Sequence, residues 1–483
     1  MVSLGFKPTA RLVFALLIAA LAIPAAAAER PNFLILMADN WSWPHAGAYG
    51  DPVVKTPTFD TLAREGMRFE RAYCSVPSCS PARAVFLTGQ AAHRLADAAS
   101  LHSQFPARLR VFPELLEEAG YAVGYSGKGW GPGNWVATGR KQNPAGESFP
   151  DFDSFLKDTD KAKPFCFWMS SKDPHVPWTE GRDFEAGIDR EQLVIPKHLP
   201  DSREVRDDLV GYYCEVQNFD RECGRLIQLL KDRGQFDNTV ILMLGDNGWQ
   251  MPRGLAHMYD LSTHVPLVVR WPQRVRTGRC DDFVCFEDLA PTLLELAGLK
   301  PLPEMTGRSL VAQLESRLQP AKAGTPARDA VFLERERHAN VRAGDVGYPC
   351  RSIRTKDFLY IRNLRPDRWP AGDPQLHFAV GPYGDVDNSL TKQLLLANPD
   401  AAELREPFRL TFGKRPAEEL YDLRNDPGEI KNVVGEAKYA GIKQELRTRL
   451  DAWMRDTEDP RAKSDDDHWD KYPYYGNRAK TAK

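Results

Sequence analysis

Short apolar runs recur along the first 271 residues, and helical patterns lie between them. Continuous apolar strands that alternate with helices are typical of a mostly parallel sheet with helices on both faces, so we predict an α/β fold of this kind. One intervening helix begins at Pro113 and ends at Gly120, and a second carries apolar residues at three- or four-residue spacing before Gly234. The predicted strands are Asn32–Ala38, Tyr121–Tyr125, Pro164–Met169, Thr239–Leu244 and Pro266–Trp271.

Polar side chains follow four of these predicted strands. In open α/β sheets, ligands bind outside the carboxyl ends of the strands, so we expect these side chains to converge on one rim of the sheet. More charge follows these buried strands than ordinary loops would require. The residues are Asp39 and Asn40, Lys128, Lys172, Asp173 and His175, and Asp246 and Asn247.

The pattern changes after about residue 320. Proline, arginine and short strand-like runs replace the alternation, and a last helix is predicted near Ile442–Met454. We predict a catalytic domain over residues 29–325 and a smaller α+β domain over residues 326–483, packed on the first. The strand-like runs are Ala330–Leu333 and Phe358–Ile361.

The N-terminus has the pattern of a signal peptide over residues 1–28. Lys7 and Arg11 precede the apolar run Leu12–Ile23, and small residues follow as far as Ala28. A retained membrane anchor is the alternative, but the run is short and Pro24 interrupts it. We therefore predict export to the periplasm or secretion, and no later segment is apolar enough for a stable membrane span.

Net charge and cysteine spacing restrict the kinds of partner and metal site that we expect. The formal net charge is −2, which gives no electrostatic reason to expect nucleic acid as a partner. Eight cysteines occur, and none of their spacings forms a zinc-type C-x-x-C pair. If Cys79 is reserved for chemistry, seven remain, so at least one of these is unpaired; the pairing of the others stays open.

The most informative motif is Cys79-Ser80-Pro81-Ala82-Arg83, followed by Leu87-Thr88-Gly89. Ser80 and Pro81 suit the cap and first turn of a helix, which places residue 79 at the helix's positive end, and Arg83 adds a fixed donor one turn later. Anions bind well at such a position. A buried cysteine before an ordinary helix cap is the alternative interpretation.

This motif resembles the maturation signature of the formylglycine-dependent sulfatases, which belong to the alkaline phosphatase superfamily, and the resemblance runs from residue 31 to about residue 455. It implies that a formylglycine-generating or anaerobic sulfatase-maturing enzyme oxidises Cys79 to an aldehyde, formylglycine. The hydrated aldehyde would then offer an oxygen to sulfur in an in-line displacement. The family pattern also implies catalytic roles for Arg83, for Lys128 on the sulfate oxygens, and for His175 as the acid near the leaving group.

The same resemblance implies a cation beside residue 79. Its ligands would be Asp39, Asn40, Asp246 and Asn247 together with the modified Cys79, and such oxygen donors suit calcium, or alternatively magnesium, better than zinc. The family often has two acids after the first strand, so Asn40 removes one unit of charge and we expect weaker metal binding. Turn chemistry is the alternative explanation, but two such pairs, each directly after a buried strand, argue against it.

Three positions depart from the family pattern. Trp130 stands where many members have histidine, Leu255 follows Gly254 where a basic residue is usual, and His264 replaces an arginine before Val265-Pro266. The loss of cationic contacts is expected to weaken binding of the sulfuryl group. Candidate substrate-binding residues are His257, Arg253, Trp130 and His338.

Two stretches, Ser78–Leu101 and Met251–Pro266, most resemble the sulfamidase (heparan N-sulfatase) branch. This implies a sulfated carbohydrate substrate such as glycosaminoglycan fragments, with N- versus O-sulfate left open. The run Glu334-Arg335-Glu336-Arg337-His338 is either part of a sugar pocket or a solvated charged face. Arg368 and Trp369 are either sugar contacts or domain packing, and Glu419–Leu423 is predicted to be structural.

Two rival functions remain. Phosphonate monoester and phosphodiester hydrolases share the fold and a similar motif, so the transferred group is alternatively phosphoryl. A non-catalytic glycan-binding protein is the other possibility, and Trp130, Leu255 and His264 are the residues that support it. The nucleophile and metal positions favour a sulfuric ester or sulfamate hydrolase over both.

Overall fold

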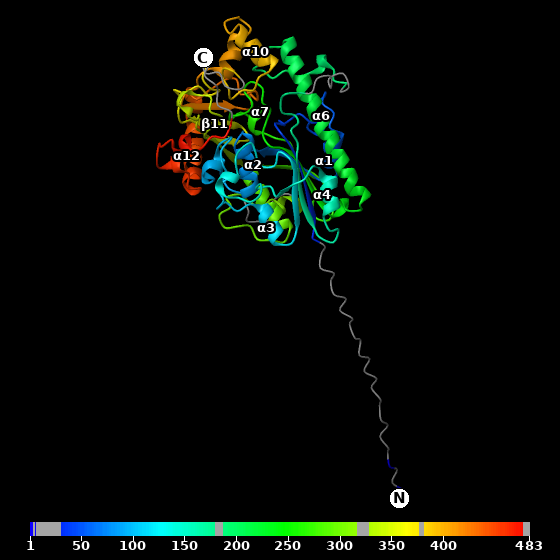
Figure 1. Ribbon diagram of the computed structural model, residues 1–483. Coiled ribbons are helices and arrows are strands. Elements are labelled where there is room, and N and C mark those ends of the chain that lie inside the picture. Colours follow the sequence, from blue (N-terminus) through cyan, green and yellow to red (C-terminus); the bar gives the residue numbers. More distant parts are fainter. Residues whose placement is uncertain (3–4, 6–29, 179–186, 316–327, 376–380, 477–483) are drawn as a thin grey trace.

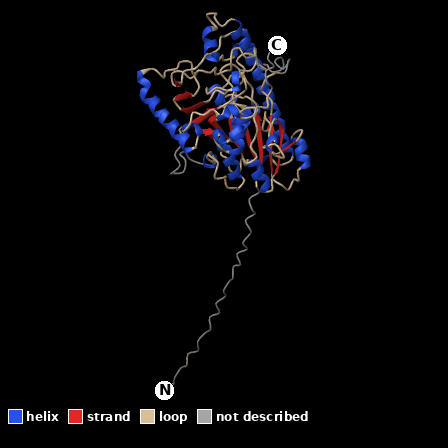
Figure 2. Cartoon of the chain, turned by 60° about the vertical axis from the view of Figure 1, so that its left-hand side comes forward, coloured by secondary structure: helices blue, strands red, loops and turns tan. Residues whose placement is uncertain are grey.

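The computed structural model describes residues 1–2, 5, 30–178, 187–315, 328–375 and 381–476 (Figure 1). These residues form an eight-stranded sheet and a four-stranded sheet, with helices packed around them (Figure 2). Nearly all of the predicted signal peptide, residues 1–28, lies outside the described residues and stays a prediction. No helix in the described part of the chain has the length and apolar character needed to cross a bilayer.

The large sheet confirms the predicted α/β fold. Its strand order is β4-β3-β5-β1-β6-β7-β2-β8, and neighbours are parallel except at β7, which runs antiparallel to both β6 and β2. The strands are β1 (Asn32–Ala38), β2 (Met67–Tyr73), β3 (Ala122–Gly127), β4 (Glu147–Ser148), β5 (Phe165–Ser170), β6 (Thr239–Gly245), β7 (Leu267–Arg270) and β8 (Gly278–Cys285).

All five predicted strands of this sheet are present, with ends shifted by one or two residues at most. The sequence interpretation missed β4, a two-residue strand at one edge of the sheet, and it also missed β2 and β8, which lie toward the other edge. Both interrupt their apolar residues with charges, such as Arg68 and Glu70 in β2 and Asp281 and Asp282 in β8. A search for continuous apolar runs finds strands buried on both faces and overlooks strands of this kind.

Alternate residues of β1 point into two separate cores. Phe33, Ile35 and Met37 pack with α2, α3 and α8, whereas Leu34, Leu36 and Ala38 pack with α1, α4 and α6. The central strand is therefore buried on both faces and reads as one apolar run. The helices of this part are α1 (Pro57–Glu65), α2 (Cys79–Thr88), α3 (Phe112–Glu118), α4 (Phe152–Asp158), α6 (Arg203–Asp232), α7 (Asp260–Thr263), α8 (Leu289–Leu296) and α9 (Val311–Glu315).

The C-terminal part confirms the predicted α+β architecture. Its antiparallel sheet has the order β12-β11-β10-β9; one face packs on α12, and the other packs on residues of the first part such as Tyr73 and Phe283. The division at residue 325 falls outside the described residues and stays a prediction. The elements are β9 (Ala330–Arg335), β10 (Cys350–Thr355), β11 (Phe358–Asn363), β12 (Glu418–Asp422), α10 (Leu390–Ala397), α11 (Arg405–Phe412) and α12 (Ala440–Asp456).

The structure also bears on the pairing of the cysteines and on the role of the Glu419–Leu423 segment. All eight cysteines are described, buried and free, so none of them forms a disulfide bond. The Glu419–Leu423 segment contains most of β12, and the Glu419 carboxylate accepts a hydrogen bond of 2.9 Å from the Tyr259 hydroxyl across the two parts. This contact supports the structural role predicted for the segment.

Candidate functional site

Cys79 is the first residue of α2 and lies at the rim where β1 and β6 end. The N-cap is Ser78 and not Ser80, so the predicted cap position is wrong by two residues. Ser78 makes no capping hydrogen bond with its side chain; instead its Oγ lies 2.8 Å from Nδ1 of His338. Residue 79 is still at the positive end of the helix, as predicted, because the first backbone N–H groups of a helix have no partners within it.

Two carboxylates lie beside this cysteine. Asp39 follows β1, and its Oδ1 lies 3.4 Å from Cys79 Sγ. Asp246 follows β6, and its Oδ1 accepts a hydrogen bond of 2.9 Å from the Asn40 backbone N–H. One ligand-type atom from each of Asp39, Cys79 and Asp246 lies within 4.8 Å of the others, so the structure brings these predicted site residues together.

Two cations neutralise these carboxylates. Arg83 Nε and one of its terminal nitrogens lie 2.9 and 2.8 Å from Asp246 Oδ2. Lys128 Nζ lies 2.9 and 2.7 Å from the two oxygens of Asp39. Arg83 also donates to the Gly129 carbonyl at 2.9 Å, which fixes the loop that carries Lys128. Four charges from four separate segments are therefore held in one buried cluster.

The charges of this cluster move its pKa values in different directions. Burial alone would raise the pKa of Asp39, but the nearby charges of Lys128, His175 and Arg83 hold it well below its usual range. Burial and the Asp39 charge raise the pKa of Asp246, and Arg83 opposes that change. Burial and Asp39 also raise the pKa of Cys79 well above its usual value. The unmodified thiol is therefore neutral at physiological pH and is a poor nucleophile.

The oxygen donors at this rim fit a hard cation. Asn40 Oδ1 lies 3.8 Å from Cys79 Sγ, and Asn247 donates from Nδ2 to Asn40 Oδ1 at 2.5 Å. Asn247 Oδ1 is buried and has no hydrogen-bond partner in the described part of the chain. An orphaned buried acceptor beside two carboxylates is the arrangement expected where an ion supplies the missing partner.

His175 lies on the loop after β5, and its side chain is 30% exposed. Its Nδ1 lies 2.5 Å from the Val176 carbonyl oxygen, so Nδ1 carries a hydrogen and donates it. The other nitrogen, Nε2, lies 3.6 Å from Asp387 Oδ2. His175 acts electrostatically on Asp39, so the structure places it at the same rim.

Two predicted substrate-binding residues, Trp130 and Arg253, make packing contacts within the protein. Trp130 is 2% exposed and donates its indole N–H to the Ser80 carbonyl at 3.0 Å. Arg253 is also 2% exposed; its guanidinium lies 3.7 Å from the centre of the Tyr259 ring and donates to the Glu429 carbonyl. Both side chains make these contacts within the protein, and their predicted role in substrate binding stays a prediction.

The histidines near the departures from the family pattern are uncharged. Burial lowers the pKa of His257 to about 3 and that of His338 to about 3. His264 stacks between the rings of Trp43 and Tyr73, at 4.3 and 4.5 Å, and burial lowers its pKa to about 4. Neutral imidazoles do not replace the missing cations, so the expected loss of cationic contacts remains.

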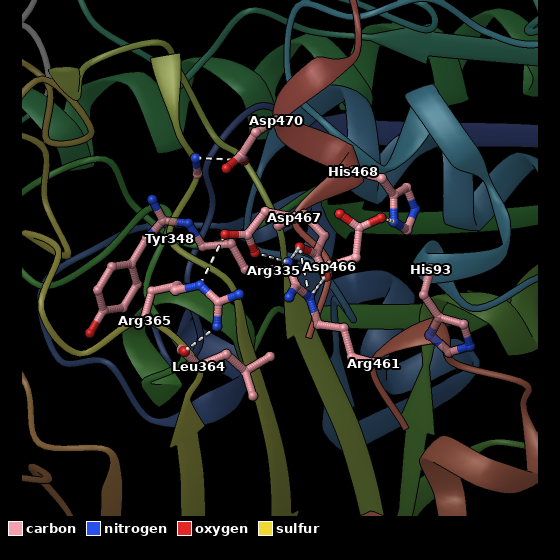
Figure 3. A network of polar contacts seen from close by, with 12 residues as sticks. His93, Arg335, Tyr348, Leu364, Arg365, Arg461, Asp466, Asp467, His468 and Asp470 are labelled. Atoms are coloured by element: carbon pink, nitrogen blue, oxygen red, sulfur yellow. Dashed lines mark hydrogen bonds and ion pairs between the residues drawn. The ribbon is translucent and has the colours of Figure 1, made fainter. Parts of the chain in front are cut away.

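The run from Glu334 to His338 is entirely buried, so the solvated-face interpretation is wrong. Glu334 accepts from His93, and Arg351 on β10 links Glu336 and Asp459. Arg461 extends this network to Asp467 (Figure 3). His338 contacts Ser78, the residue before Cys79, through its Nδ1 at 2.8 Å.

Arg368 and Trp369 follow the domain-packing interpretation. Arg368 donates to Asp467 at 2.6 Å and lies 3.3 Å from Asp470, two acids of the network in Figure 3. Trp369 packs edge-to-face against Tyr383, and its backbone carbonyl accepts from Arg342 at 2.7 Å. These contacts tie the loops of the C-terminal part together.

Sequence interpretation missed two kinds of residue at the site. Ser170, at the end of β5, accepts a hydrogen bond from Arg83, and Asp387 faces His175 from the C-terminal part. Ser170 was detectable as the polar residue that ends a predicted strand. Asp387 lies in Gly384-Asp385-Val386-Asp387, which no strand or helix pattern connects to the rim.

Comparisons with known protein families agree with this geometry. The family model described as Sulfatase matches residues 31–143 and 132–299, which is more than half of the chain. A second model, described as N-sulphoglucosamine sulphohydrolase, C-terminal, matches residues 245–373. The first covers every residue of the cluster around Cys79, and the second ends before Asp387.

Individual relatives are similar over most of their length. Human N-sulphoglucosamine sulphohydrolase is 27% identical over 480 residues, covering 89% of this chain and 91% of its own. An ulvan-active sulfatase of Formosa agariphila is 27% identical over 475 residues, covering 88% and 75%.

Two solved structures share the fold. One is a complex with its substrate D-glucosamine-2-N,6-O-disulfate; it has a TM-score of 0.62 and 22% identity and covers 89% of this chain and 98% of its own. The phosphonate monoester hydrolase of Agrobacterium radiobacter has a TM-score of 0.62 and 21% identity, with coverage of 89% and 96%.

Proposed function

We propose, from the premise that this chain belongs to the sulfatase family, that Cys79 is oxidised to formylglycine and acts beside a divalent cation. The chain is an enzyme that acts on sulfate esters or sulfamates. The proposal that Cys79 becomes formylglycine beside a cation rests on the cluster at the start of α2, where Cys79 lies close to Asp39 and Asp246. Its thiol is neutral and buried, so it gains a nucleophilic oxygen only by modification.

Different residues of this cluster have different proposed roles in metal binding, positioning and sulfate binding. Asp39, Asn40, Asp246 and Asn247 would hold the cation with an oxygen of modified residue 79. We favour calcium, with magnesium as the alternative, and such an ion supplies Lewis-acid polarisation and charge neutralisation. Arg83 fixes Asp246 and the Lys128 loop, and Lys128 presents its ammonium group to the sulfate oxygens.

His175 completes the proposed reaction as the acid. A hydroxyl oxygen of the hydrated aldehyde at residue 79 loses its proton to water and forms a bond to sulfur. The bond from sulfur to the leaving atom breaks, and the leaving atom takes the electron pair and a proton from His175. The second hydroxyl of residue 79 then loses its proton, which re-forms the aldehyde and releases sulfate. Nε2 is the nitrogen available for this transfer, because Nδ1 already donates to the Val176 carbonyl. The partial exposure of the imidazole leaves room for a leaving group beside it.

The proposed substrates are sulfated carbohydrates, in particular sulfated amino sugars from glycosaminoglycans. The match to the C-terminal model of N-sulphoglucosamine sulphohydrolases and the similarity to the human enzyme of that name support this choice. A signal peptide over residues 1–28 and a formylglycine-generating or anaerobic maturing enzyme complete the proposal, with action in the periplasm or outside the cell.

Two alternatives are ranked below this function. A phosphonate or phosphodiester hydrolase keeps support from the structural likeness to a phosphonate monoester hydrolase, but the family model that covers the site is that of sulfatases. A non-catalytic glycan-binding protein is favoured by the neutral histidines and by the packing role of Trp130. The intact cluster around Cys79 argues against it.

The test starts with the protein co-produced with a formylglycine-generating enzyme. Mass spectrometry of the tryptic peptide Ala72–Arg83 is expected to show an aldehyde in place of the Cys79 thiol, while the Cys74 thiol in the same peptide is an internal control. The matured protein is then offered sulfamates, sulfate esters and phosphodiesters. Cys79→Ala is expected to lower turnover about 10³-fold or more. An unconverted thiol, with a control sulfatase converted in parallel, would contradict the proposal.

A further inference from the structure

Asp387 is a partly buried carboxylate for which the proposed reaction has no role. Its side chain is 18% exposed, and Oδ2 has no hydrogen-bond partner among the residues that the structure describes. Burial raises the pKa of this carboxyl, and the charges of His175 and Lys392 oppose that change. An unsatisfied buried acceptor is unfavourable for folding, so a hydrogen-bond donor from outside the chain is the natural partner.

The loop that carries Asp387 is held rigidly. Asp208 on α6 accepts hydrogen bonds from the first two backbone N–H groups of α10, at 3.2 and 2.6 Å. Lys392 on α10 donates from Nζ to the Val386 carbonyl at 2.6 Å. Figure 1 shows α10 beside α6. Because the backbone is fixed on both sides of Asp387, its carboxylate is presented in a defined position.

Asp387 faces the proposed acid of the reaction. The separation of 3.6 Å between Asp387 Oδ2 and His175 Nε2 is too long for a direct hydrogen bond. The charges of Asp39 and Lys128 also act on Asp387, so the pair adjoins the cluster at Cys79. In the protonated form that the proposed acid role requires, His175 Nε2 is a donor, and it lies beside one acceptor, Asp387 Oδ2.

One donor and one acceptor match the bridging atom of only one of the two substrate classes. The nitrogen of a sulfamate carries a hydrogen and a lone pair, whereas the bridging oxygen of a sulfate ester carries lone pairs alone. We propose that Asp387 is a specificity-determining residue that accepts the bridging N–H of an N-sulfated amino sugar while His175 donates to the same nitrogen. This inference rests on the proposed function and assigns its preference to N-sulfate.

The hydrogen bond from the substrate nitrogen to Asp387 becomes stronger as the reaction approaches its transition state. As the sulfur–nitrogen bond breaks, the nitrogen takes the electron pair and the His175 proton, and its N–H groups become better donors to Asp387. An interaction that grows toward the transition state raises kcat. The bridging oxygen of an ester instead develops negative charge and offers no hydrogen before proton transfer, so the carboxylate opposes its departure. Asp387 thus favours sulfamates and disfavours esters.

The test compares two substrates on one matured enzyme, D-glucosamine N-sulfate and D-glucosamine 6-O-sulfate. Asp387→Asn keeps the shape and supplies an amide N–H, so we expect kcat/KM for the sulfamate to fall about 30- to 100-fold, as for a lost hydrogen bond to a charged group. The value for the ester is expected to stay or rise. Asp387→Glu keeps the charge but moves the acceptor, and an intermediate loss is expected.

Two controls separate specificity from structure. Ser389→Ala removes the side-chain cap of α10, a hydrogen bond of 3.1 Å to the Lys392 N–H, and is expected to change both substrates alike. Binding of D-glucosamine N-sulfate to Cys79→Ala, measured by calorimetry with and without Asp387→Asn, reports the contact without turnover and is expected to weaken.

With a wild type that hydrolyses at least one of the two substrates, three results would overturn the inference. They are equal losses on both substrates in Asp387→Asn, no loss on the sulfamate, and a wild type that hydrolyses only the ester. The last leaves the proposed function standing. A wild type that carries formylglycine and hydrolyses neither substrate overturns this inference and removes the sulfated amino sugars from the proposed function.

Discussion

Among the residues that the structure describes, two buried clusters bring metal-ligand types together, and they are built differently. Asp39, Cys79 and Asp246 meet at the rim of the large sheet, while His93, Glu334 and Asp459 meet at the junction with the C-terminal part. In each, the ligand-type atoms lie within 4.8 Å of one another, and all the residues are buried. Closeness and burial alone therefore do not distinguish a candidate metal centre from a structural ion network.

The difference lies in which polar atoms are satisfied. At the rim, Asn247 Oδ1 has no partner within the described residues, beside the carboxylates. At the junction, His93 uses both ring nitrogens, on Glu334 at 3.0 Å and on the Thr457 carbonyl at 3.1 Å. Arg351 closes the junction with an ion pair of 2.6 Å to Asp459. The rim has an acceptor left over for a ligand, and the junction has none in these groups.

The largest expected effect is a loss of folding stability when the ion network at the junction is disrupted. Arg351→Met removes the cation shared by Glu336 and Asp459 and leaves buried carboxylates unpaired, so we expect the free energy of unfolding to fall by about 3–5 kcal/mol. Arg409→Met is the matched control, because Arg409 pairs with Glu406 on the surface, and about 1 kcal/mol or less is expected there. Chemical denaturation measures both; equal losses would show that the buried network carries no special stability.

A smaller effect tests the rim. Calcium at about 100 times its dissociation constant is expected to raise the free energy of unfolding by about 2.7 kcal/mol, and a chelator is expected to remove this gain. Asp246→Asn is expected to abolish most of the gain, because it removes a ligand at the rim. Arg351→Met is expected to keep it, since the junction does not bind the ion. A gain that disappears in Arg351→Met and survives in Asp246→Asn would reverse the assignment of the two clusters.

The two clusters also differ in how far sequence alone predicts them. The rim follows from local patterns, since Asp39-Asn40 and Asp246-Asn247 each end a buried strand and parallel strands bring their ends together. The junction does not, because Glu334 is paired with His93, which lies 241 residues away in the chain. A run of charges reads as a solvated face until its partners are known.

The same reason explains the individual errors at the site. Asp387 reaches His175 from another part of the chain, and Trp130 turns inward to the Ser80 carbonyl, which no spacing reveals. His264 occupies the position of a family cation but stacks between two aromatic rings, so the motif gives its position and not its environment. Local order was predictable, and contacts between residues distant in the sequence were not.

The smallest expected effect concerns the charge of His93 at the junction. Both partners of its ring nitrogens are acceptors, so the buried imidazole is held protonated, and Glu334 raises its pKa above the usual 6.5 although burial opposes this. A raised pKa stabilises the fold fully below about pH 6.5, and this stability is lost as the pH rises through the folded-state pKa. The loss is about 1.4 kcal/mol for each pH unit that separates the folded-state pKa from the unfolded-state pKa.

His93→Gln is expected to remove this part of the pH dependence, because the amide of glutamine does not titrate. His468→Gln, at a site that is 31% exposed, is expected to leave it in place. Denaturation curves from about pH 6 upward, taken as differences from the wild type, measure the slope of the unfolding free energy above the usual pKa of histidine. A slope unchanged in His93→Gln would mean that the junction is held by Arg351 alone.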